Sequence, residues 1–186
     1  MQRNAKKPPS NICAVSRALV VRGIWMLKVI SKLFRNNLYI QLWRDRIVVI
    51  DENSVVVFDQ KPMVAYDKKE IVRSVGNCLD VENTADIEMV NPFVDYEQIN
   101  KNTVIARVVF SHIFHLAGGR FISQAPKVVL HFMDSTFSIL KENDNGVFYK
   151  ILFEAGAHEV GFYQGHVLNS EDIKRGKIPG IKFKSN

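Results

Sequence analysis

The chain has 186 residues, of which 47% are hydrophobic and 24% are charged, and 12 are phenylalanine. This composition excludes a wholly disordered chain, and the length suits one compact domain better than two. The two cysteines, Cys13 and Cys78, are too few for a disulfide framework and lack partners at metal-ligand spacing, which indicates a reduced compartment.

The formal net charge of +6 is unevenly distributed along the chain. Residues 1–46 hold ten Lys or Arg and one acid, residues 47–173 hold ten bases and eighteen acids, and residues 174–186 hold five bases and no acid. A nucleic-acid-binding domain usually carries its basic patch on the fold itself. Basic ends on an acidic body instead favour contacts with a membrane surface or another anionic partner, and we expect no nucleic acid.

Residues 1–25 are expected to be a disordered extension. Arg17, Arg22 and Lys28 interrupt the apolar stretches near the N-terminus, which argues against a secretory signal peptide. The sequence contains no run of 18 apolar residues, so we expect no segment that spans a membrane.

Residues 26–35, MLKVISKLFR, have the pattern of a short basic amphipathic helix, which Asn36-Asn37 would end. Aliphatic and aromatic side chains share one face and its edges, and the cations lie opposite. The candidate membrane-binding residues are Trp25, Met26, Leu27, Lys28, Val29, Ile30, Lys32, Leu33, Phe34 and Arg35. This pattern suits the surface of an anionic bilayer. It suits equally an ordinary helix packed on a sheet, and the pattern alone does not separate the two.

The elements predicted after this helix alternate in type. Short β-branched runs at 38–43, 46–51 and 54–59 predict a three-strand meander, followed by a less regular region from Pro62 to Pro92. Further along we expect a helix at 94–119 ended by Gly118-Gly119, a buried strand at 127–134, a helix at 136–155 interrupted at 143–146, a strand at 158–165, and a basic flexible tail at 167–186. This order predicts an α/β fold, a mixed sheet with flanking helices, of the ribonuclease-H-like or actin-like subdomain type.

Four stretches carry a family resemblance: 26–42, 61–66 with 75–77, 87–99, and 127–133 with 154–165. The last, EAGAHEVGFYQG, is the most specific. Together they resemble the N-terminal part of the MreB rod-shape-determining family of bacterial actin-like proteins, over less than half of a full member. The resemblance implies a membrane helix at 26–37 and the first half of an actin-like fold at 38–166. It also implies a peripheral position on the inner face of the cytoplasmic membrane and a role in cell shape, with full-length MreB-type filaments or other cell-shape proteins as candidate partners.

The chain departs from the family at the first phosphate loop. Where the family has D-x-G-T, this sequence has Gln41, Leu42, Trp43 and Arg44. The glycine that lets the backbone approach a phosphate is replaced by the largest side chain. The resemblance therefore does not bring ATP-binding or hydrolytic residues with it. We expect no catalytic residue, cofactor or metal, and a structural or regulatory protein rather than an enzyme.

Several other residues carry a chemical and a structural interpretation side by side. The Trp43–Arg46 turn could hold an anion or be a solvated turn, and His112 and His115 lie three apart on a predicted helix without an evident third metal ligand. His131 is expected to be a hydrogen-bonded core residue, and Asp134-Ser135 end a strand without a catalytic partner. Two alternative functions stay open: a remnant actin-like ATP-binding protein and a basic-ended nucleic-acid-binding module.

Overall fold

The computed structural model describes residues 37–69, 71–77, 87–118, 125–138, 145–175, 178 and 180–186. All elements discussed below belong to the compact unit formed by residues 36–186. The predicted extension at 1–25, almost all of the predicted membrane helix at 26–37, and both cysteines lie outside the described residues.

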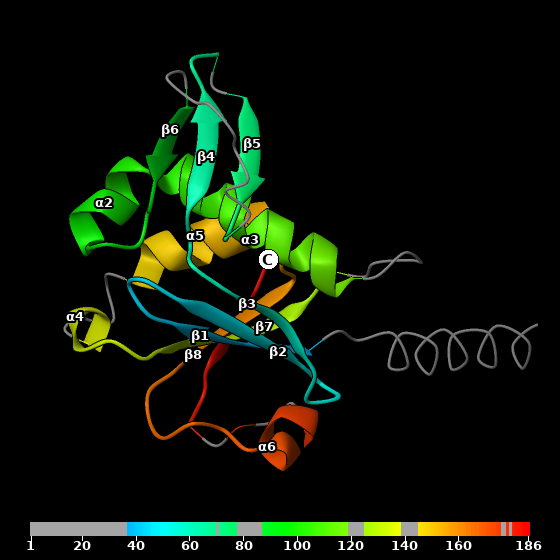
Figure 1. Cartoon of the computed structure of the whole chain (residues 1–186). Helices are drawn as coiled ribbons and strands as arrows, with labels where there is room; N and C mark the ends of the chain where they lie inside the picture. Colours follow the sequence, from blue (N-terminus) through cyan, green and yellow to red (C-terminus); the bar gives the residue numbers. More distant parts are fainter. Residues whose placement is uncertain are drawn as a thin grey trace, which may run out of the picture. The chain divides into compact units, whose positions relative to one another are not determined.

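A six-stranded mixed sheet organises this unit, in the order β3-β2-β1-β7-β8-β9 (Figure 1). The strands are β1 (Asn37–Leu42), β2 (Ile47–Asp51), β3 (Val56–Gln60), β7 (Lys127–Phe132), β8 (Glu159–Tyr163) and β9 (Phe183–Ser185). The predicted meander is confirmed, since β1, β2 and β3 pair antiparallel. The predicted strands at 127–134 and 158–165 are also confirmed, and β1, β7 and β8 run parallel. The α/β fold class is therefore the one expected.

Two helices cover one face of this sheet, and they also pack on each other (Figure 1). They are α3 (Thr103–Ala117) and α5 (Asn145–Ala155). Central strand β1 alternates between the two faces: Leu38, Ile40 and Leu42 join the core under these helices, and Tyr39 joins a second apolar cluster on the opposite face. Because β1 is buried on both sides, its sequence reads as a nearly continuous apolar run.

The region from Pro62 to Pro92 is more regular than predicted. It contains a second, antiparallel sheet in the order β5-β4-β6, formed by β4 (Val64–Asp67), β5 (Val72–Val75) and β6 (Ile87–Val90). Each of these strands has only four residues. Runs this short do not show a clear alternation of apolar and polar residues, which is why the sequence did not reveal them.

The predicted helix at 94–119 is two helices, α2 (Tyr96–Lys101) and α3. Asp95 caps α2, accepting a hydrogen bond from the Gln98 amide at 2.8 Å. Asn102 has a non-helical backbone conformation and separates the two helices, and α3 ends before Gly118 as predicted. The predicted helix at 136–155 corresponds to α4 (Ser135–Ser138) and α5. Residues 139–144, between them, lie outside the described residues.

The described part of the stretch 167–186, which was expected to be a flexible tail, contains regular structure. It includes α6 (Ser170–Arg175) and β9, which pairs antiparallel with β8. Ile173 and Ile178 are buried with Tyr39 and Val129 on the second face of the main sheet. Isolated isoleucines in a basic segment are a weak sequence signal, and only an open apolar sheet face gives them something to cover.

Candidate functional site

The turn between β1 and β2, residues 43–46, includes Trp43 and Arg44, which the sequence resemblance aligns with the first phosphate loop of the MreB family. The Trp43 amide donates to the Arg46 carbonyl at 2.9 Å and closes the turn. The Asn91 side chain, from beyond β6, donates to the Arg44 carbonyl at 2.7 Å. A phosphate loop works through free backbone N–H groups. Here the Trp43 N–H is already bonded within the turn.

The first guanidinium of the turn is engaged by a carboxylate. Arg44 Nε lies 3.0 Å from Asp134 Oδ2. Asp134 follows β7, whose carboxyl end adjoins that of β1, since Leu42 aligns with Phe132 in the parallel register. The polar residue at the strand end, a common place for catalytic groups in α/β folds, therefore pairs with the turn.

The second guanidinium is engaged on the other side. Arg46 Nε and Nη2 donate to the two carboxylate oxygens of Asp59 on β3, at 2.7 and 2.8 Å. These hydrogen bonds hold the pKa of Asp59 below its usual value and raise the pKa of Arg46. The guanidinium carbon also lies 5.7 Å from the centre of the Trp43 ring. Both cations of the turn thus face carboxylates of the same chain, which favours the solvated-turn interpretation over an anion site.

Beside this turn lies an open hollow of about 470 Å³, lined by Trp43, Arg46, Asp59 and Lys61 among others. Its far wall is fixed by Gln60, whose side-chain oxygen accepts from the Asn77 amide at 2.8 Å. This hollow could not be predicted from the sequence, because its walls come from the β1–β2 turn, the end of β3 and the residues after β5.

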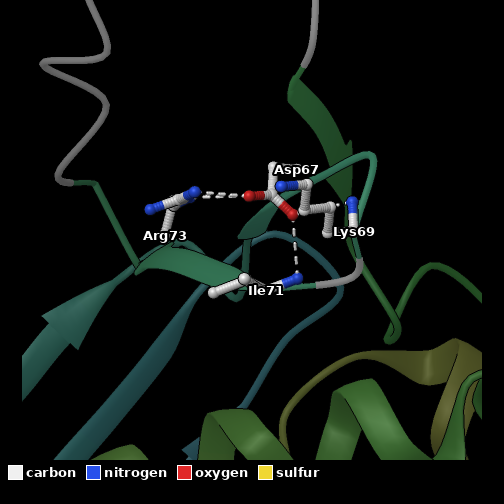
Figure 2. A network of polar contacts seen from close by, with 4 residues as sticks. All are labelled: Asp67, Lys69, Ile71 and Arg73. Carbon is white, nitrogen blue, oxygen red and sulfur yellow. Dashed lines mark hydrogen bonds and ion pairs between the residues drawn. The ribbon is translucent and has the colours of Figure 1, made fainter.

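A second polar network shapes the β4–β5 turn (Figure 2). The Asp67 carboxylate accepts from the backbone N–H groups of Lys69 and Ile71 at 2.9 and 3.0 Å, and from Arg73 Nε at 3.0 Å. The bond from Ile71 is the largest cause of the lowered pKa of Asp67, with Arg73 and Lys69 adding to it. One carboxylate therefore holds the turn in shape, which is a structural role.

The histidines form no metal site in the described structure. His112 is half-buried with its ring against Phe58 at 6.4 Å, and burial and the neighbouring His115 lower its pKa. His115 is exposed. Among the described residues, no group of three or more His, Cys, Asp and Glu side chains is placed to hold a metal ion.

His131 is a hydrogen-bonded core residue, as predicted. Its Nδ1 lies 2.6 Å from the Tyr39 hydroxyl oxygen, and both side chains are buried. Burial lowers the pKa of His131 and raises that of Tyr39.

All ten candidate membrane-binding residues lie outside the described residues, so their role stays a prediction. They are Trp25, Met26, Leu27, Lys28, Val29, Ile30, Lys32, Leu33, Phe34 and Arg35. In the part of the chain that the structure describes, no helix combines the length and apolarity needed to cross a bilayer.

No protein-family model matches the sequence, and no curated protein matches it. Crystal structures of MreB 5 of Spiroplasma citri do match. The AMPPNP-bound structure has a TM-score of 0.57 and 20% sequence identity, and the match covers 70% of this chain and 38% of that chain. The ADP-bound structure has a TM-score of 0.49 and 18% identity at the same coverage. The chain thus spans 38% of the length of MreB 5, and over that part it has an MreB-like, actin-type α/β fold.

Proposed function

We propose that the protein is a membrane-associated, MreB-like cytoskeletal protein that acts in cell shape, structurally or as a regulator, without nucleotide hydrolysis. It would lie peripherally on the inner face of the cytoplasmic membrane. The observation that carries the proposal is an actin-type fold whose β1–β2 turn is closed by internal ion pairs.

Three features of the turn and of the end of β1 support a nucleotide-independent role. The Trp43 N–H is bonded to the Arg46 carbonyl, so that donor is not directed to a phosphate. Gln41, which replaces the acidic residue of the family motif, is buried and donates to the Tyr39 hydroxyl at 3.4 Å. The two arginines pair with Asp134 and Asp59, so the turn offers little net positive charge to a triphosphate.

Membrane association rests on residues 26–35. A ten-residue helix with three cations and an apolar face supports only modest affinity for an anionic bilayer, because each buried methylene and each cation contributes a small term. Several copies on one surface would strengthen binding through effective concentration. Association with full-length MreB-type filaments or other cell-shape proteins would supply such copies.

Co-sedimentation with anionic liposomes tests the membrane part. The full chain is compared with a variant carrying Lys28→Glu, Lys32→Glu and Arg35→Glu. The matched control carries Lys61→Glu, Lys69→Glu and Lys150→Glu, which changes the net charge equally at exposed lysines of the folded unit. We expect the first variant to stay in the supernatant and the control to pellet with the wild type. Equal loss in both variants would indicate only nonspecific charge attraction, and no pelleting of the wild type would refute membrane binding.

Nucleotide titration tests the other part. We expect no saturable heat from ATP with Mg²⁺ in a calorimeter and no change in pelleting when ATP is added. Saturable micromolar binding would instead support the remnant ATP-binding protein. Tight DNA binding that falls steeply with salt would support the nucleic-acid-binding module.

A further inference from the structure

A chain of buried hydrogen bonds runs along the face of the main sheet that α6 covers. The Tyr39 hydroxyl on β1 lies 2.6 Å from His131 Nδ1 on the neighbouring strand β7. The two side chains are 1% and 2% exposed. The Gln41 amide and the Leu168 backbone N–H also point to the Tyr39 oxygen, each at 3.4 Å.

The geometry fixes which groups donate. The backbone carbonyl of Gly165, which can only accept, also acts on the ring and raises the pKa of His131. Because Nδ1 faces Tyr39, Nε2 is the nitrogen left to donate to this carbonyl. In the neutral ring Nδ1 is then the acceptor, and the Tyr39 hydroxyl donates to it. The same hydroxyl oxygen is left to accept from Leu168.

This pair contacts the segment after β8 through the Leu168 N–H, which donates to the Tyr39 hydroxyl, and through the Gly165 backbone, which acts on His131. Gly165 and Leu168 lie where the chain leaves β8 and turns back over the sheet. Beyond them, Ile173 and Ile178 pack on Tyr39 and Val129. The far end of the segment is held by β9 on β8, and the Asn186 amide donates to the His158 carbonyl at 3.1 Å.

We propose that Tyr39 and His131 form a clasp that holds the described residues of the segment 165–186 on the sheet, and that loss of the clasp releases this segment as a unit. Release would uncover the apolar face around Tyr39 and Val129 and the edge of β8.

We expect protonation of His131 to open the clasp. A second proton on His131 turns Nδ1 into a donor and places it against a hydroxyl oxygen that already receives Gln41 and Leu168. The described groups that face the ring are Tyr39 and Gln41 on β1, Tyr163 on β8 with its ring centre 4.9 Å away, and the Gly165 carbonyl. None of them is a carboxylate that would stabilise the imidazolium. Burial accordingly lowers the pKa of His131.

Hydrogen exchange followed by mass spectrometry tests the clasp in the full chain. In Tyr39→Phe, peptides from 165–186 should exchange about tenfold faster, the change expected when a buried hydrogen bond of roughly 1.4 kcal/mol is lost, whereas β1 and β7 keep their protection. The control Tyr96→Phe removes a hydroxyl from a half-buried tyrosine on α2, outside the clasp, and should leave the exchange of 165–186 unchanged.

A second measurement needs no substitution. In the wild type, lowering the pH from about 7.5 to about 5.5 should speed exchange of 165–186 relative to β7, after correction for intrinsic rates, because His131 becomes protonated as the segment opens. His131→Gln should remove this pH dependence. Uniform exchange of the segment and the sheet strands, under both conditions, would overturn the proposal.

Discussion

The substitution Phe148→Ala is the most direct test of how α5 packs on the main sheet. Phe148 is fully buried, and its ring centre lies 4.9 Å from that of Phe132, 6.3 Å from that of Phe137 and 6.4 Å from that of Phe162. Truncating a buried phenylalanine costs about 3–5 kcal/mol through lost transfer free energy and the cavity left behind. Because Phe148 also loses edge-to-face contacts with three rings, we expect about 4 kcal/mol of lost unfolding free energy.

Urea unfolding followed by circular dichroism measures this loss. With a slope of about 2 kcal/mol per molar urea, the midpoint should fall by about 2 M. Val104→Ala on α3 is the control, since Val104 is 60% exposed and its truncation should cost less than about 0.5 kcal/mol. If the two variants unfold at the same urea concentration, α5 does not cover the sheet as described. The hydrophobic core of the actin-type fold would then be wrong.

Three smaller predictions follow from local contacts. Gly161→Val should detach β9, because even a Cβ at Gly161 would lie 2.8 Å from the Phe183 ring, and faster amide exchange at 181–186 would report it. Asp67→Ala should loosen the β4–β5 turn and deprotect the backbone amides of Lys69 and Ile71, which NMR exchange would detect. Arg46→Ala should raise the pKa of Asp59 toward its ordinary value, since Arg46 lowers it. The stabilising effect of that carboxylate is present at neutral pH and is lost as the pH falls through its lowered pKa, and carboxyl NMR titration of both proteins measures the shift.

Only some features of the β1–β2 turn could be predicted from the sequence. The sequence alone shows that Trp43 replaces a phosphate-loop glycine and that two arginines occupy one turn. It does not show which carboxylates pair with these arginines, because Asp59 and Asp134 lie 13 and 90 residues away from the arginines that they bind. Asp59 reaches this end of the sheet because β3 pairs with β2 and β2 with β1, and Asp134 reaches it because β7 pairs with β1.

The sequence by itself determined the strands and helices with long apolar runs and the α/β class that their order implies. The meander, β7 and β8 were predictable because each is an apolar or β-branched run of five or more residues, and α3 was predictable because its apolar residues recur at helical spacing. The tertiary structure decided the elements that are too short to show a period: the second sheet, α6 and β9. Such segments gain their stability from the surface that they cover, and that surface exists only once the main sheet has formed.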